Sequence, residues 1–159
     1  MSAMPDNRPG RYFEDYPVGA VFTGGSIRVS EAEILDFARR YDPQPMHVDK
    51  RAADAGPFGG LIASGWHTGA LMMQLFVAHF LSPASSLASP GLDELRWLKP
   101  VRPGDELSLK VTVLTARPSH SNLDRGVVTS LVEVLNQAGE AVMTLKPVSL
   151  LRRRSPEPR

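Results

Sequence analysis

The sequence contains no cysteine. This absence excludes disulfide bonds, thiolate metal sites and cysteine nucleophiles, and it agrees with a reducing compartment. The sequence also has almost no excess of charge of either sign, since its net charge is +1 at neutral pH. This balance predicts neither nucleic acid nor an acidic surface as a partner. No stretch approaches the run of roughly 20 apolar residues that crosses a membrane. We therefore expect a protein that binds neither nucleic acid nor a membrane.

The composition is typical of a globular protein with one hydrophobic core. Its 159 residues are 42% hydrophobic and 22% charged, which suits a single domain. Residues 1–10 are polar and lack the apolar core of a signal peptide. Residues 152–159 are charged and rich in proline. We expect a single domain over residues 11–151, flexible tails at 1–10 and 152–159, and a cytoplasmic location.

The first regular elements are a strand followed by a helix. Residues 21–29 predict a strand, and Gly24-Gly25 within it indicates a bulge or a bend. Ser30 and Glu33 have the spacing of a capping box, so a helix begins after Ser30. Apolar residues at helical spacing continue this helix to Tyr41.

Asp42 and His47 lie on either side of two prolines. The helix must end before Asp42, because a residue that precedes proline avoids the helical region. Pro45 is expected to keep the next residues extended, which places the pair at the two ends of a stiff loop. A carboxylate can accept a proton from water, and an imidazole can donate or relay one near neutral pH. Such a pair suits the addition or removal of water across a double bond, although Asp-Pro and Gln-Pro are also common turn dipeptides.

The longest helical segment, residues 66–81, is apolar nearly all the way round. A helix that is apolar on most sides is buried on most sides. Pro147 indicates an edge strand or a bulge in the last strand. The order of the elements predicts an α+β domain in which a curved antiparallel sheet wraps around one long central helix. Its four later strands are predicted from their alternating pattern at residues 92–98, 106–116, 126–136 and 141–151.

Small residues lead into the long helix at Ala63-Ser64-Gly65. The first N–H groups of a helix have no internal partners and carry partial positive charge. Gly65 lets another group approach that backbone closely. An N–H at this point can bind a thioester oxygen and stabilise the enolate that forms when water adds. The same residues also fit an ordinary helix start capped by Ser64.

These residues together resemble a known family. The segment Tyr41-Asp42-Pro43-Gln44-Pro45-Met46-His47-Val48-Asp49, followed by Gly65, is similar to the motif of the MaoC-like dehydratases and (R)-specific enoyl-CoA hydratases. That motif is an Asp, any residue, Asn, Pro, any residue and His, with a glycine that opens the central helix. Phe58 lies where these proteins carry an aromatic residue. The resemblance covers roughly residues 11–151.

The resemblance implies a hot-dog fold, in which an antiparallel sheet wraps a long helix, and a homodimer or a higher assembly of dimers. It implies hydration or dehydration of acyl-CoA thioesters in fatty acid metabolism. Coenzyme A would be part of the substrate, with no separate cofactor and no metal. By carry-over, Asp42 would activate the water, and His47 would orient it and handle the second proton.

The resemblance also implies a substrate-binding set around the helix start. The Gly65 N–H would bind the thioester oxygen, with Ser64, Trp66 and Phe58 beside the substrate. Two positions depart from the family pattern. Gln44 replaces the usual Asn, so the hydrogen bonds that orient the acid–base pair differ, and Met73 stands where relatives place a small polar residue.

Other polar residues are given structural roles. His67, in the first turn of the long helix, is expected to be packed or hydrogen-bonded rather than catalytic. The spacing of its neighbouring His and Asp residues matches no metal motif. Arg96, Lys99 and Arg102 have the charge to meet coenzyme A phosphates, but basic residues at strand edges are usually solvated.

Two alternative functions remain open from the sequence. A hot-dog thioesterase usually takes its carboxylate from the central helix, and residues 66–81 contain no Asp or Glu. A non-catalytic subunit that binds acyl-CoA beside a catalytic partner is compatible with the same fold, because function resides in the site rather than in the fold.

Overall fold

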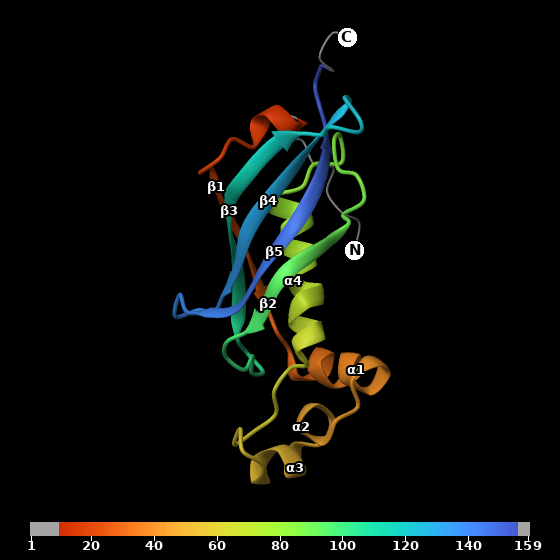
Figure 1. Cartoon of the computed structure of the whole chain (residues 1–159). Helices are drawn as coiled ribbons and strands as arrows, with labels where there is room; N and C mark the ends of the chain where they lie inside the picture. The colour runs from red at the N-terminus through yellow and green to blue at the C-terminus, as the bar shows by residue number, and fades with distance from the viewer. Residues whose placement is uncertain (1–9, 156–159) are drawn as a thin grey trace.

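A five-stranded antiparallel sheet and one long helix packed along it form the body of the protein (Figure 1). The computed structural model describes residues 10–155, and residues 1–9 and 156–159 lie outside the described part. The helical elements are η1 (Phe13–Asp15), α1 (Glu31–Tyr41), α2 (Pro45–Val48), α3 (Lys50–Ala55) and α4 (Gly65–His79). The strands are β1 (Val21–Arg28), β2 (Gly91–Trp97), β3 (Glu106–Pro118), β4 (Arg125–Leu135) and β5 (Ala141–Arg152).

The sheet has the strand order β1-β3-β4-β5-β2, and every neighbouring pair is antiparallel. Side chains alternate between buried and partly exposed along β3, β4 and β5, as expected for strands with one face on the core. Leu107, Leu109 and Val111 of β3 are at most 2% exposed. The predicted α+β arrangement of a sheet around a long helix is confirmed.

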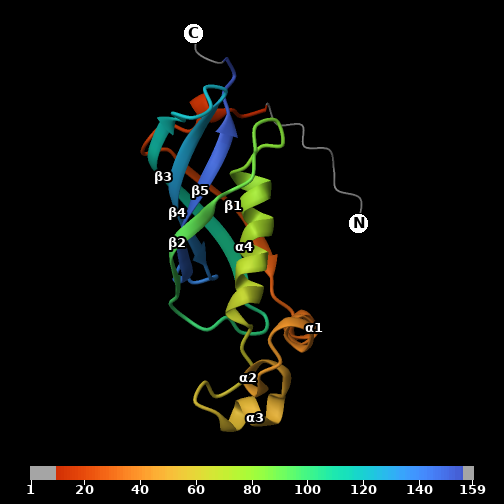
Figure 2. The same cartoon turned by 45° about the vertical axis from the view of Figure 1, so that its right-hand side comes forward.

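Helix α4 packs along the sheet with one side only (Figure 2). Leu75 and Phe76 are buried in the core that α4 shares with the sheet. The opposite side of the helix carries Trp66, Met73 and Val77, which are 62%, 45% and 47% exposed. The prediction that this helix is buried on most sides is therefore wrong for the single chain, because the sheet covers only one side of it. No helix among residues 10–155 is long and apolar enough to cross a membrane.

The glycine pair in β1 allows the helix to approach the sheet closely. The register of β1 against β3 shifts between Gly24 and Ile27, which confirms the predicted bulge. A Cβ atom on Gly24 would lie 2.4 Å from His79 Nδ1, and one on Gly25 would lie 2.2 Å from Leu75 Cδ2. Any larger residue at these positions would have to displace the His79 or the Leu75 side chain of α4.

Helices α1, α2 and α3 form a separate group beyond the first turn of α4 (Figure 2). The predicted capping box is confirmed: the Glu33 N–H donates to Ser30 Oγ, and the Ser30 N–H donates to Glu33 Oε2, both at 3.1 Å. The expectation of extended chain after Pro45 is wrong, because Pro45 begins the short helix α2. Proline suits this first helical position, where its missing N–H would have no partner.

Two further expectations are corrected near the C-terminus. Pro147 is not on an edge strand, since β5 pairs with both β4 and β2, and the nearby bulge lies in β2 between Asp93 and Arg96. Residues 152–154, which were expected in a tail beyond the domain, contact the rest of the chain. Arg152 ends β5, and the Arg154 N–H donates to Glu14 at 3.0 Å. Residues 156–159 of that tail, like residues 1–9 of the N-terminal one, lie outside the described part of the chain.

Candidate active site

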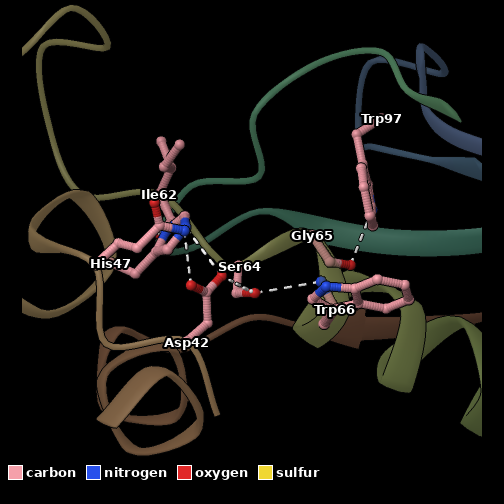
Figure 3. Close-up of polar contacts among 8 residues, drawn as sticks. Asp42, His47, Ile62, Ser64, Gly65, Trp66 and Trp97 are labelled. Carbon is pink, nitrogen blue, oxygen red and sulfur yellow. Dashed lines mark hydrogen bonds and ion pairs between the residues drawn. The ribbon is translucent and has the colours of Figure 1, made fainter.

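The predicted acid–base pair lies together at the start of α4 (Figure 3). Asp42 is the C-cap residue that directly follows α1, and His47 lies on α2. The distance from Asp42 Oδ2 to His47 Nε2 is 3.4 Å. Their side chains are 17% and 7% exposed, so the two groups meet where little solvent competes for them. The pair arises because α1 stops before Pro43 and α2 begins at Pro45.

The backbone fixes the orientation and the tautomer of His47. Its Nδ1 lies 2.8 Å from the carbonyl oxygen of Ile62. A carbonyl oxygen only accepts, so Nδ1 must carry a hydrogen and donate it. In the neutral imidazole, Nε2 is then left with a lone pair that faces Asp42. The Ile62 segment is itself anchored to α2, since the Ile62 N–H donates to the Met46 carbonyl at 3.2 Å.

The carboxylate of Asp42 receives one side-chain donor on each oxygen. The Gln44 amide donates to Oδ1 at 2.7 Å, and the Ser64 hydroxyl donates to Oδ2 at 2.6 Å. These two hydrogen bonds, with that from Ser64 the larger effect, hold the pKa of Asp42 below its ordinary value. Asp42 is therefore an anion at neutral pH. Gln44, despite replacing the usual Asn, contacts the Asp42 carboxylate directly.

Ser64 connects that carboxylate to the first turn of α4. It is the N-cap of α4 and accepts a hydrogen bond from the Trp66 N–H at 3.3 Å while it donates to Asp42. Ser64 is fully buried and does not line the cavity in front of the pair. Its predicted contact with substrate stays a prediction, whereas its contact with Asp42 gives it a positioning role.

Gly65 is held by a residue that the sequence did not single out. Trp97, the last residue of β2, donates its indole N–H to the Gly65 carbonyl at 2.9 Å (Figure 3). A Cβ atom on Gly65 would lie 2.4 Å from Trp97 Cε2, so the indole ring itself requires glycine here. The Gly65 N–H makes no hydrogen bond within residues 10–155. The only feature of the sequence that could have indicated a role for Trp97 is its position as an aromatic residue at the end of a strand.

A cavity of about 440 Å³ opens in front of the pair. Asp42, Gln44 and His47 form its polar end, and Thr68 and Lys99 add polar atoms elsewhere. The predicted site residues Phe58, Trp66 and Gly65 all line this cavity. The remaining lining is mostly apolar: Met46, Ile62, Ala63, Trp97, Leu98 and Pro100. An apolar chamber with a carboxylate, an imidazole and a free N–H suits an uncharged acyl group with a carbonyl.

The other polar residues near the site have structural contacts. His67 stacks on Phe37 at 4.8 Å between ring centroids, and burial lowers the pKa of His67. It does not line the cavity. Lys99 forms an ion pair with Glu140, and Arg102 donates to the Phe58 carbonyl at 2.6 Å. Within residues 10–155, no cluster of His, Asp and Glu side chains has the arrangement of a metal site.

The model of the MaoC-like domain matches residues 16–135. This stretch includes the acid–base pair, the start of α4 and Trp97. The chain belongs to the MaoC-like domain family.

Similarity to individual MaoC-like proteins extends over most of the chain. The crystal structure of the MaoC-like dehydratase from Rhodospirillum rubrum is 42% identical, covers 92% of this chain and 99% of its own, and superposes with a TM-score of 0.83. The uncharacterized protein YdeM of Bacillus subtilis is 36% identical over 124 residues, which are 78% of this chain and 86% of YdeM. The 3-hydroxybutyryl-CoA dehydratase of Methylorubrum extorquens is 28% identical over 83% of this chain and 82% of its own length.

A more distant structure identifies the fold. A Mycobacterium tuberculosis protein described as having a double hotdog fold is 18% identical and superposes with a TM-score of 0.78 over 94% of this chain and 46% of its own. The fold of this MaoC-like protein is therefore the hot-dog fold that its sequence pattern predicts.

Proposed function

We propose that this protein is a hydro-lyase that adds water to a 2-enoyl-CoA thioester, or removes it from the 3-hydroxyacyl-CoA. The observation that carries the proposal is the 3.4 Å approach of Asp42 Oδ2 to His47 Nε2 at the polar end of an otherwise apolar cavity. Membership of the MaoC-like family and the similarity to a 3-hydroxybutyryl-CoA dehydratase support the same reaction class.

The pair is suited to holding one water molecule. Asp42 is an anion, and His47 in its neutral form presents a lone pair at Nε2, so both groups accept hydrogen bonds. A water molecule that donates one hydrogen to each of them keeps its own oxygen lone pair free for attack. Gln44 and Ser64 hold the carboxylate while the Ile62 carbonyl holds the imidazole, so the water is oriented by a preorganised frame.

In the proposed hydration, one proton of the water moves in three steps, to Asp42, then to His47 and then to Cα. The water oxygen bonds to Cβ of the enoyl group as one of its protons passes to Asp42, and the π electrons move through Cα to the thioester oxygen. His47 receives that proton across the short contact with Asp42 and delivers it from Nε2 to Cα, which restores the carbonyl. Dehydration follows the same path in reverse. General acid–base catalysis of this kind contributes about 10²–10⁴-fold to the rate.

The start of α4 is suited to the charge that develops on the thioester oxygen. Gly65 lines the cavity, and its N–H has no partner within residues 10–155 and lies at the positive end of the helix dipole. A hydrogen bond from it is strongest when that oxygen carries the enolate charge. Proton transfer and oxyanion binding suffice for this reaction, so the proposal includes no cofactor. Coenzyme A enters as part of the substrate, and a cytoplasmic location is part of the same proposal.

The exposed side of α4 supports a homodimer as the active form. Trp66, Ala70, Met73 and Val77 follow one another at helical spacing on that side, and all are exposed. Leu92 and Leu98, on and beside the edge strand β2, are 48% and 53% exposed. An apolar stripe next to an unpaired strand edge marks a surface that proteins usually cover. A second copy of the chain would cover it symmetrically and bury the open wall of the cavity.

The test is a direct assay of the reaction. Purified protein is mixed with crotonyl-CoA, and the loss of the absorbance of the conjugated thioester is followed. We expect hydration in the native protein and a loss of about 10²–10⁴-fold in Asp42→Asn and in His47→Ala. Activity that survives both substitutions would overturn the roles given to this pair. Release of free thiol from a saturated acyl-CoA would favour a thioesterase instead.

A further inference from the structure

A second apolar cavity lies farther along the same side of α4. Its volume is about 500 Å³, and it shares no lining residue with the cavity in front of Asp42 and His47. Met72, Met73 and Phe76 line it from α4, and Leu92 lines it from β2. The two cavities therefore occupy successive stretches of the space between α4 and β2, two elements that lie side by side in Figures 1 and 2.

Trp97 joins β2 to α4 beside the first cavity. Its indole N–H donates to the Gly65 carbonyl at 2.9 Å, which pins the last residue of β2 to the first residue of α4. The ring is so close to the helix that a single added carbon on Gly65 would meet it at 2.4 Å. Trp66 packs against the same indole edge to face, with 5.2 Å between ring centroids. Both rings line the catalytic cavity, and neither lines the second one.

We infer that the Trp66–Trp97 pair restricts the enzyme to short acyl groups by denying longer chains the second cavity. The inference rests on the proposed hydro-lyase function and specifies its substrate class. The carbonyl end of the acyl group is fixed by the Gly65 N–H and its double bond by the Asp42–His47 pair, so the remaining carbons must extend toward the apolar wall. A short chain ends at the two indoles. A longer chain must displace a ring that is hydrogen-bonded to the backbone.

The size of the effect follows from the cost of unburied methylenes. One methylene too many in a closed pocket changes kcat/KM by about 10–200-fold. A site closed by the two indoles is therefore expected to prefer crotonyl-CoA over 2-octenoyl-CoA by at least about tenfold. Opening the barrier should give the longer chain access to the buried side chains of Met72 and Phe76 and should reverse much of that preference.

The experiment compares three variants with the native protein. Trp97→Ala removes the ring and opens the path. Trp97→Phe keeps an aromatic ring but lacks the N–H that binds the Gly65 carbonyl. Leu92→Trp fills the second cavity from an exposed position of β2 that has no contact with the catalytic pair. For each protein, kcat/KM is measured for crotonyl-, 2-hexenoyl- and 2-octenoyl-CoA.

We expect Trp97→Ala to raise the ratio of octenoyl to crotonyl kcat/KM by about tenfold or more, and Trp97→Phe to leave this ratio near that of the native protein. Adding Leu92→Trp to Trp97→Ala should lower the ratio again, because the larger side chain takes up the space that the longer acyl chain would fill. Equal native activity on all three substrates would overturn the inference. So would a Trp97→Ala variant that loses activity on every substrate by the same factor, since that is the signature of a purely structural role.

Binding provides a readout that does not depend on turnover. The chain contains two tryptophans, and both line the catalytic cavity. Their intrinsic fluorescence therefore reports directly on a ligand there, and Trp66 still reports in the Trp97 variants. Butyryl-CoA is expected to bind the native protein more tightly than octanoyl-CoA, and Trp97→Ala to remove this difference. If no enoyl-CoA is hydrated at any length, the proposed function fails, while this binding series still decides whether the indoles form the barrier.

Discussion

Asp42 Oδ2 lies 3.4 Å from His47 Nε2. A separate hydrogen bond orients each side chain: His47 donates to the Ile62 carbonyl, and Asp42 accepts from the Ser64 hydroxyl. If the two groups hold one water molecule together, their contributions to catalysis are not additive. We expect Asp42→Asn, His47→Gln and the double variant to lose similar factors in kcat, each about 10²–10⁴-fold. Steady-state kinetics with circular dichroism as a folding control measures this. Losses that multiply in the double variant would show that the residues act independently.

Ser64 is expected to control both the ionisation of Asp42 and the start of α4. Ser64→Ala removes the larger of the two donors that hold the pKa of Asp42 down, so that pKa rises toward its ordinary value. Asp42 acts as an anion, so the acidic limb of the profile of kcat/KM against pH should move to higher pH. Loss of the N-cap should also lower the free energy of unfolding by about 0.5–2 kcal/mol. An unmoved acidic limb at reduced stability would leave Ser64 with the capping role alone.

Gln44 offers a graded comparison with Ser64. Gln44→Ala removes only the donor to Asp42 Oδ1, the second of the causes that lower the pKa of that carboxyl. The acidic limb should therefore move in the same direction as in Ser64→Ala, but by less. Gln44 lies outside regular secondary structure and caps no helix through its side chain. The free energy of unfolding should change little, which separates this variant from Ser64→Ala. A larger shift than that of Ser64→Ala would reverse the order of the two donors.

Gly65→Ala is expected to displace Trp97. The new Cβ would lie 2.4 Å from Trp97 Cε2, so the indole must move and give up its hydrogen bond to the Gly65 carbonyl. Overpacking of this kind costs about 1–3 kcal/mol of folding free energy. Thermal unfolding and tryptophan fluorescence measure the two effects. The double variant Gly65→Ala, Trp97→Ala should recover stability relative to Gly65→Ala, and no recovery would place the clash elsewhere.

The exposed stripe of α4 is expected to be a contact between two copies of the chain. Val77→Glu puts a charge into the centre of an apolar surface, which should shift a dimer to monomers and lower activity with it. Val18→Glu is the matched control, because Val18 is also exposed, at 64%, but lies outside α4. Analytical ultracentrifugation of both variants and the native protein distinguishes the outcomes. A native protein that sediments as a monomer at assay concentrations would remove the dimer from the proposal.

Local sequence patterns correctly predicted the structural features that depend only on neighbouring residues. The capping box of Ser30 and Glu33 and the bulge at Gly24-Gly25 depend on neighbouring residues, and both are confirmed. The sequence pattern does not predict the short helix α2, because proline usually keeps the chain extended. The first position of a helix is the exception to that rule, since the missing N–H costs nothing there.

The site was predictable in part. Asp42 and His47 were found because the residues between them carry a recognisable pattern, and the structure brings them together with Gly65 at one cavity. Trp97 was not found, because it reaches Gly65 across a separation of many residues along the chain. No periodicity or spacing encodes the pairing of the end of β2 with the start of α4. The exposed side of α4 was missed for a related reason, since its apolar residues look the same in sequence whether a sheet or a second chain covers them.

The sequence by itself predicted the candidate pair Asp42 and His47, the family, and the order of the strands and the two longer helices, because each of these is set by residue types at short spacing. Only the tertiary structure decided that Nδ1 of His47 donates to Ile62, that Ser64 binds Asp42, and that Trp97 requires glycine at position 65. These contacts depend on distances between elements that are remote in the chain. Such distances are fixed by the packing of α4 against the sheet and not by any local preference of the backbone.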